Sequence, residues 1–172
     1  MEDHFESINS DHWGYEIQTG GYGNGEFDWT TNDPKNSFVD AEGLHIIPTL
    51  TTESTGITEE QLLNGYTLNI TKSDGDGSCT SSEVLKACGV RSNSTLGTII
   101  PPVRSARMTT KGKKSIKYGR VEIVAKMAKG DWLWPALCKF FVTVASLLYE
   151  QELIIFRDDA RRRRIRCMAS LR

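Results

Sequence analysis

Residues 118–127 show the clearest alternation of apolar and polar side chains along the chain. The apolar positions that share one side of an extended backbone are Val121, Ile123, Ala125 and Met127. The positions between them, on the other side, are Arg120, Glu122, Val124 and Lys126. Because a period of two is typical of a strand that buries one face, we predict a strand whose second face presents Glu122.

Further stretches are also predicted to be strands and indicate a β-rich protein, and two of them, residues 13–17 and 65–71, alternate with the same period. These stretches are residues 13–17, 38–48, 65–71, 97–100 and 103–110. Thr58 is expected to cap one helical turn over residues 58–63. Residues 72–95 are rich in Ser, Asp, Gly and Thr, and we expect them to form a long surface loop.

The charge of the chain is unevenly distributed, although its 172 residues, 38% hydrophobic and 25% charged, fit one soluble domain. Seven arginines against two aspartates give residues 157–172 a charge of +5, and the net charge of −1 then leaves −6 for residues 1–156. An acidic body argues against nucleic acid as its partner. The Arg-rich run at 161–166 admits a nucleic-acid or nuclear role, but a solvated chain end is the interpretation we favour.

Residues 136–149 form a mostly apolar run of fourteen residues that is interrupted by Lys139. A helix that crosses a bilayer needs about 20 apolar residues, so we do not expect membrane insertion. The run is expected to be either a buried helix or an unpaired apolar strand.

The cysteines and histidines do not show the spacing of a metal site. The four cysteines contain no Cys-x-x-Cys pair and the three histidines are scattered, so we predict no metal. Two N-glycosylation sequons begin at Asn69 and Asn93, and they matter only in a chain that enters the secretory pathway. The first residues have neither a basic region nor an apolar core, so they are not expected to be a signal peptide.

Three blocks of the sequence resemble glycoside hydrolase family 16, and in particular its laminarinase-type endo-β-1,3(4)-glucanases. They are Tyr-Gly-Asn-Gly-Glu-Phe-Asp-Trp-Thr at 22–30, Arg-Ser-Ala-Arg-Met-Thr-Thr-Lys-Gly at 104–112, and Lys-Tyr-Gly-Arg-Val-Glu through Trp-Leu-Trp-Pro-Ala at 117–136. The blocks stand in the order of the family, and the likeness is closest to fungal members. The resemblance implies an all-β, concanavalin A-like jelly-roll sandwich, of which residues 1–136 would be an incomplete N-terminal portion and residues 137–172 an irregular or helical tail.

The resemblance also implies a β-glucan partner, no cofactor, and an extracellular or cell-wall location. The sugar contacts that it implies are Tyr22, Asn24, Glu122, Trp132 and Trp134. Packing is the alternative for the aromatic residues: Tyr22 in a Gly-rich hairpin, and the two tryptophans at the end of a strand. Cys79 and Cys88 bracket a Ser-rich loop, and similar loops of fungal members carry a disulfide.

The likeness ends where the family carries its catalytic residues. In the family, Trp-Pro-Ala leads into a Glu-x-Asp-x-x-Glu strand that supplies the nucleophile and the acid/base, but here Ala136 is followed by Leu-Cys-Lys-Phe-Phe-Val. No catalytic residue is therefore assigned, and we predict that this chain does not hydrolyse glucan alone. The alternatives are a non-catalytic β-glucan-binding protein, or a non-functional truncated product whose residues 137–172 derive from a retained intron or a shifted frame.

Overall fold

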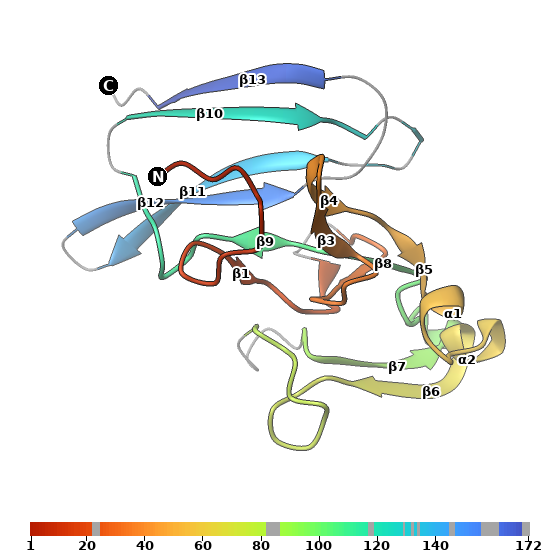
Figure 1. Ribbon diagram of the computed structural model, residues 1–172. Helices are drawn as coiled ribbons and strands as arrows, with labels where there is room; N and C mark the ends of the chain where they lie inside the picture. Colours follow the sequence, from red (N-terminus) through yellow and green to blue (C-terminus); the bar gives the residue numbers. More distant parts are fainter. Residues whose placement is uncertain are drawn as a thin grey trace. The chain divides into compact units, whose positions relative to one another are not determined.

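The computed structural model is mostly β. It describes residues 1–21, 25–81, 87–116, 119–128, 130–131, 133, 135–144, 147–155 and 162–169, with the backbone alone for Gly119 and for the residues after Pro135. The elements before residue 100 are β1 (Gly14–Tyr15), β2 (Asp28–Thr30), β3 (Ser37–Asp40), β4 (Gly43–Ile46), β5 (Thr49–Leu50), α1 (Thr51–Ser54), α2 (Glu59–Leu63), β6 (Asn64–Asn69), β7 (Gly89–Asn93) and the 3₁₀ helix η3 (Ser94–Leu96). They are followed by β8 (Val103–Ser105), β9 (Met108–Thr109), β10 (Gly119–Lys126), β11 (Ala136–Val144), β12 (Leu147–Ile155) and β13 (Arg162–Ala169) (Figure 1).

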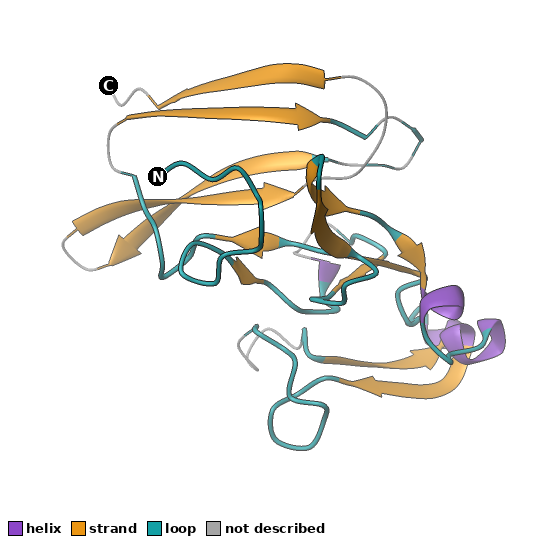
Figure 2. Cartoon of the chain, viewed as in Figure 1, coloured by secondary structure: helices purple, strands orange, loops and turns teal. Residues whose placement is uncertain are grey.

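Most elements of the described chain are strands, and Figure 2 shows them in orange with the short helices in purple. The mostly β class is therefore confirmed, whereas the jelly-roll sandwich stays a prediction. Among the described residues, no helical segment combines the length and the apolar character needed to span a bilayer.

The chain divides into two compact units. The first unit comprises Met1–Gly14, Val39–Ile46 and Met108–Arg172, and the second comprises Tyr15–Phe38 and Ile47–Arg107. Each unit therefore combines segments that are far apart in the sequence, and the chain passes from one unit to the other more than once. The division at residue 136 that the resemblance implies stays a prediction.

The second unit is organised around an apolar core. Its buried members are Ile17, Trp29, Ile57, Leu62, Leu68, Ile70, Cys79, Cys88 and Ile100. One sheet of this unit has the strand order β2-β8-β5, in which β2 and β8 run parallel and β5 and β8 antiparallel. A second sheet is the antiparallel β6–β7 pair, which supplies Leu68 to the core.

The predicted helical turn is confirmed as α2, and its cap is the expected residue. The Thr58 hydroxyl accepts a hydrogen bond from the backbone N–H of Gln61 at 3.2 Å, and the Gln61 side chain accepts one from the N–H of Thr58 at 2.9 Å. This reciprocal capping box satisfies two N–H groups that a helix start leaves without intrahelical partners. Leu62 of this helix is buried in the core.

Alternation correctly located β6 but not its partner. Leu68 and Ile70 are buried and Tyr66 is partly buried, as predicted. The prediction of a long loop over residues 72–95 is wrong for its last part, because Gly89–Asn93 forms β7 and pairs with β6. Gly-Val-Arg-Ser-Asn carries a weak strand signal, and it is the pairing with β6 that makes the segment extended.

Three other predicted strands differ from the structure, and the first of them, predicted over residues 38–48, is divided into the two strands β3 and β4. Residues 97–100 form no strand, and only Thr98 makes an isolated bridge, to Asn93. The single strand predicted over 103–110 is two short strands, β8 and β9, and Ala106 and Arg107 lie between them. All of residues 104–110 are buried, so the alternation that would have revealed the break is absent from this stretch.

The prediction of an irregular or helical tail is also wrong. After Pro135 the described backbone forms β11, β12 and β13, and β11 and β12 make an antiparallel pair from Ala136↔Ile155 to Val144↔Leu147. Residues 140–144 read Phe-Phe-Val-Thr-Val, and aromatic and β-branched side chains favour extended backbone. The periodicity of a continuous apolar run does not distinguish a strand from a buried helix, which is why the sequence left both interpretations open.

The tail strands pair with strands from the preceding sequence in the first unit. β13 pairs antiparallel with β10 over its whole length, from Gly119↔Ala169 to Lys126↔Arg162. β12 pairs with β9, giving a four-stranded sheet of order β1-β9-β12-β11. β3 and β4 form a separate two-stranded sheet.

Candidate functional site

The strand β10 presents the polar face that its sequence predicts. Its exposed residues are Arg120, Glu122, Val124 and Lys126, whereas Ala125 is buried and Val121 and Ile123 are partly buried. The predicted alternation is confirmed. The exposed face displays charged groups of both signs on an extended backbone, and carboxylate and guanidinium groups are suited to hydrogen bonding with the hydroxyl groups of a sugar.

Glu122 and Arg120 form an ion pair on this face. They lie two residues apart on one strand, so their side chains point to the same side, and Arg120 Nη2 contacts Glu122 Oε2. The side chain of Glu122 is 34% exposed and that of Arg120 is 51% exposed. The ion pair holds the carboxylate in place while leaving much of it accessible, which suits a binding residue.

The other sugar contacts implied by the resemblance lie outside the described residues. These are Tyr22, Asn24, Trp132 and Trp134, so their roles stay predictions. The two ends of the segment that carries Tyr22 and Asn24 are nevertheless close together. Gly21 has a φ of +60°, and a Cβ built on it would lie 2.9 Å from the backbone N and O of Glu26. Only glycine fits this close approach.

Phe27 directly follows Glu26 and is an exposed aromatic residue that the sequence analysis did not single out. It is 67% exposed, and its carbonyl accepts a hydrogen bond from the N–H of Val103, the first residue of β8, at 3.4 Å. Asp28, Trp29 and Thr30 immediately after it are all buried in β2. An aromatic ring held in water by an anchored backbone offers an apolar surface on which a sugar ring can stack.

Two of the three blocks that carry the family resemblance are neighbouring strands. Residues 28–30 and 103–105 pair in parallel, in the register Asp28↔Val103 to Thr30↔Ser105. The side chain of Arg104 is 8% exposed, and its Nη2 lies 3.1 Å from Asp33 Oδ2. Its guanidinium carbon also lies 4.7 Å from the centroid of the Trp29 ring. These contacts give Trp29 of the first block and Arg104 of the second block a packing role.

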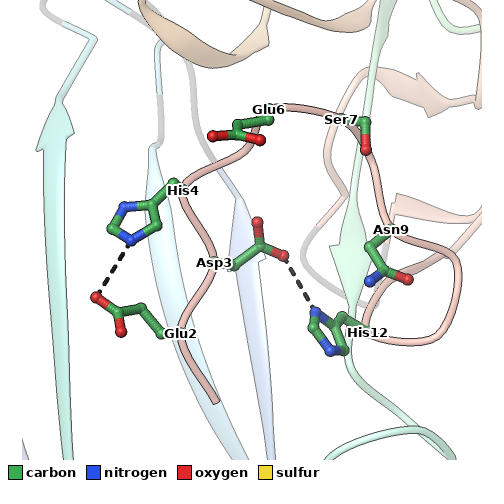
Figure 3. Close-up of a pocket in the computed structure, with 7 residues that line it drawn as sticks. All are labelled: Glu2, Asp3, His4, Glu6, Ser7, Asn9 and His12. Carbon is green, nitrogen blue, oxygen red and sulfur yellow. Dashed lines mark hydrogen bonds and ion pairs between the residues drawn. The ribbon is translucent and has the colours of Figure 1, made fainter.

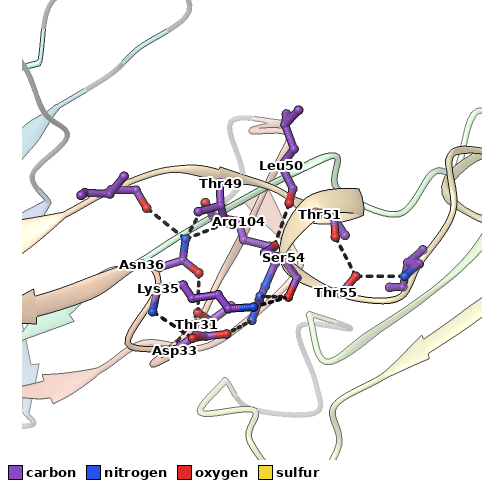
Figure 4. A network of polar contacts seen from close by, with 12 residues as sticks. Thr31, Asp33, Lys35, Asn36, Thr49, Leu50, Thr51, Ser54, Thr55 and Arg104 are labelled. Atoms are coloured by element: carbon purple, nitrogen blue, oxygen red, sulfur yellow. Dashed lines mark hydrogen bonds and ion pairs between the residues drawn. The ribbon is translucent and has the colours of Figure 1, made fainter.

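A buried asparagine extends this network (Figure 4). Asn36 is fully buried, and its Nδ2 donates to the carbonyl of Ile47 at 3.0 Å and to Thr49 Oγ1 at 2.9 Å. The backbone N–H of Lys35, followed by the charge and hydrogen bond of Arg104, holds the pKa of Asp33 below its ordinary value, against the opposing effect of burial. The network connects β5, β8 and the residues after β2, and it stabilises the three-stranded sheet.

The first unit contains an open pocket near the start of the chain (Figure 3). It is lined by Glu2, Asp3, His4, Glu6, Ser7, Asn9 and His12. Asp3 Oδ2 accepts a hydrogen bond from Trp13 Nε1 at 2.8 Å and lies 3.4 Å from His12 Nδ1. Burial raises the pKa of Asp3, but hydrogen bonds from Phe5 N–H, Trp13 and His12 outweigh that effect and lower it. No group of three potential ligands among the described residues is arranged to hold a metal ion.

The second unit contains a disulfide between Cys79 and Cys88. Its Cα atoms are 5.5 Å apart, and both cysteines belong to the buried core. The two sequons begin on the neighbouring ladder, since Asn69 is the last residue of β6 and Asn93 the last residue of β7.

Comparison with known proteins relates this chain in sequence to β-1,3-glucan-binding proteins. It is 39% identical over 138 residues to a β-1,3-glucan-binding protein of Penaeus monodon, which covers 80% of this chain and 36% of that protein. It is 33% identical over 122 residues to Gram-negative bacteria-binding protein 2 of Drosophila melanogaster, which covers 70% of this chain and 23% of that protein. The chain thus spans about a third or less of the length of these relatives.

Among solved structures, the chain is similar to the laminarinase catalytic domain from Thermotoga maritima. The two are 30% identical in sequence with a TM-score of 0.47, over 80% of this chain and 41% of that domain. No family model matches the chain. The resemblance to fungal members in particular is not supported by these relatives.

Proposed function

We propose that this chain binds β-1,3-glucan without hydrolysing it, as part of a protein with a laminarinase-like, jelly-roll architecture. The observation that carries the proposal is the identity of 39% over 138 residues to the Penaeus monodon β-1,3-glucan-binding protein. The exposed carboxylate of Glu122 on β10 supports it, because a charged acceptor on a polar strand face can take hydrogen bonds from sugar hydroxyls. We assign Phe27 of the second unit as another sugar contact, because its side chain is exposed to solvent.

Binding without turnover follows from the chemistry of the reaction. A retaining glycosidase needs two carboxyl groups about 5–5.5 Å apart, one to attack the anomeric carbon and one to protonate the leaving oxygen. The sequence contains no Glu-x-Asp-x-x-Glu, and β10 carries a single carboxylate, Glu122. A lone carboxylate can bind a sugar hydroxyl but cannot take both roles in one displacement.

The test measures laminarin affinity and release of reducing ends with the same purified chain. We expect saturable binding to laminarin and no reducing ends above a chain-free blank. Glu122→Gln removes the charge while keeping the size, and it should weaken binding by roughly tenfold, the effect of losing about 1.5 kcal/mol from a charged hydrogen bond. Glu60→Gln removes the same charge from the exposed face of α2 in the second unit and serves as the matched control.

Two results would overturn the proposal. Release of reducing ends by the wild-type chain would show that it is an enzyme, and absence of laminarin binding by a cooperatively folded chain would show that it does not recognise this glucan. A chain that binds nothing and also unfolds without a cooperative transition would favour the non-functional truncated product.

A further inference from the structure

The two sequons of this chain are identical in form but lie in different structural settings on the β6–β7 ribbon. In β6, Leu68 is buried, so Thr67 and Asn69 lie on the opposite, outward face. In β7, Ser92 is buried, so Arg91 and Asn93 lie outward as well. Asn69 pairs with Gly89 at one end of the ladder, and Asn93 pairs with Asn64 at the other. Both acceptor asparagines therefore share one face of the ribbon.

Asn69 is engaged by the loop that follows it. Its Oδ1 accepts hydrogen bonds from the backbone N–H of Thr71 at 3.0 Å and from the Thr71 hydroxyl at 2.7 Å. The hydroxyls of Thr71 and Ser73 donate hydrogen bonds to the Asp74 carboxylate. Polar contact with the side chains of Thr71, Asn69 and Ser73 lowers the pKa of Asp74. The Oδ1 of Asn69 is thus bonded twice by Thr71, the third residue of its own sequon, and its amide lies beside the carboxylate of the next turn.

The backbone of this loop closes over Asn69. The N–H of Gly77 donates to the carbonyl of Thr71 at 2.9 Å, which returns the chain to the end of β6. A Cβ added to Gly75 would lie 2.6 Å from Asn69 Oδ1 and 2.5 Å from the N of Thr71. Because Gly75 packs directly on the Asn69 amide, the sequon residues form the inside of the turn.

Asn93 is held differently. Its Oδ1 accepts a hydrogen bond from the N–H of Leu96 at 3.2 Å and so caps η3. Its backbone N and O both bond to Thr98, at 2.8 and 3.1 Å. Among the described residues, no acceptor lies within hydrogen-bond distance of its Nδ2. Ser94, Thr95 and Leu96 after it are all exposed, with Leu96 at 75%. The backbone and the Oδ1 fix this side chain while its nitrogen stays available.

A disulfide gives independent support for a secretory route. The Cys79–Cys88 bridge is buried in the core of the same unit, and structural disulfides form and persist in oxidising compartments. These are the compartments in which N-glycans are attached.

We propose that Asn93 accepts an N-linked glycan and that Asn69 instead closes the 69–77 loop. In the transfer, Asn93 Nδ2 attacks C1 of an oligosaccharide linked to a lipid pyrophosphate. The N–C1 bond forms, the bond between C1 and the pyrophosphate oxygen breaks, Nδ2 releases one proton, and the lipid pyrophosphate leaves. The glycan projects from the outward face of β7 at η3, so this end of the ribbon faces solvent in the mature protein.

The experiment expresses the full chain behind a cleavable secretory leader in insect cells. Glycopeptide mass spectrometry then measures the occupancy of each sequon, in the medium and in the retained fraction, so that poor secretion does not prevent the measurement. We expect Asn93 to be occupied in most molecules and Asn69 in few. Thr95→Ala removes the second sequon but keeps Asn93, which caps η3. This variant should lack the glycan and should melt within about 1 °C of the wild-type protein.

Asn69→Ala tests the loop-closing role. It removes the Oδ1 acceptor and should lower the melting temperature of enzymatically deglycosylated protein by roughly 5 °C, the effect of about 1 kcal/mol in a small domain. Asn64→Gln, at the exposed cross-strand partner of Asn93, belongs to no sequon and should leave the glycan mass unchanged. An unoccupied Asn93 would overturn the acceptor assignment. High occupancy of Asn69, or an Asn69→Ala protein as stable as wild type, would overturn the loop-closing role.

Discussion

The guanidinium of Arg104 lies 4.7 Å from the centroid of the Trp29 ring, and the same side chain pairs with Asp33 at 3.1 Å. Arg104 and Trp29 are partners in the register of β2 and β8. Arg104 therefore contacts residues of a segment that lies 75 residues earlier in the sequence. Trp29, which it covers, belongs to the core of the second unit.

Replacement of Arg104 should destabilise the second unit. Arg104→Ala leaves Asp33 without its guanidinium partner and uncovers Trp29, and we expect a loss of about 3 kcal/mol in the free energy of unfolding. Arg104→Lys keeps the charge but loses the planar group that stacks on the ring, so it should recover only part of this loss. Chemical denaturation monitored by tryptophan fluorescence measures both. Lys35→Ala removes an exposed cation beside the same network and is the matched control, with an expected change within about 0.5 kcal/mol.

The stability of the chain should fall in acid, and Asp33 should contribute to the fall. The N–H of Lys35 and then Arg104 hold its folded-state pKa below the ordinary value of an aspartate. Its contribution is therefore fully present above the pKa of the unfolded chain, about 3.9, and is lost as the pH falls through the lower folded value. Denaturation from pH 7 to pH 2.5 should show a smaller decline for Asp33→Asn than for wild type. An identical decline in both proteins would show that Asp33 does not contribute.

The second unit should depend on its disulfide. The bridge closes a short loop of sequence separation 9, and in the chain-entropy account a loop of this size stabilises by about 2.5 kcal/mol. Both cysteines are buried, so Cys79→Ala with Cys88→Ala is chosen to avoid placing a polar group in the core. The double variant should unfold at lower denaturant concentration than wild type. A reductant should lower the stability of wild type and leave the double variant unchanged, which separates loss of the bridge from loss of packing.

How far the sequence predicted this structure depends on what each residue pattern encodes. Alternation located β10 and β6, because one face of each is buried, and the capping box at Thr58 is a purely local signal. β7 could not be found in this way, because its extended backbone is imposed by pairing with β6. The strands after Ala136 were missed for a related reason. β13 pairs with β10, and neither segment taken alone shows in its sequence that it will pair with the other.

The candidate site shows the same division. Glu122 could be placed on an exposed strand face from the alternation around it, and the structure confirms that placement. Phe27 was missed because a single aromatic residue carries no period, and the buried Trp29 two positions later would suggest the core for both. Only the structure shows that burial begins at Asp28 and that Phe27 stands outside it.

Phe27 should contribute to laminarin affinity through its ring. Phe27→Ala removes the stacking surface and should weaken binding by roughly fivefold to tenfold, because contacts of an aromatic face are worth about 1 kcal/mol beyond their area. Phe27→Trp enlarges the face and should retain or improve affinity. Leu96→Ala is the matched control, since it removes an even more exposed apolar side chain, 75% against 67%, from the same unit. Equal losses from Phe27→Ala and Leu96→Ala would mean that any exposed apolar group matters equally, and the assignment of Phe27 as a sugar contact would then be withdrawn. A loss confined to Phe27→Ala, with unchanged melting temperatures, would identify the ring itself as the contact.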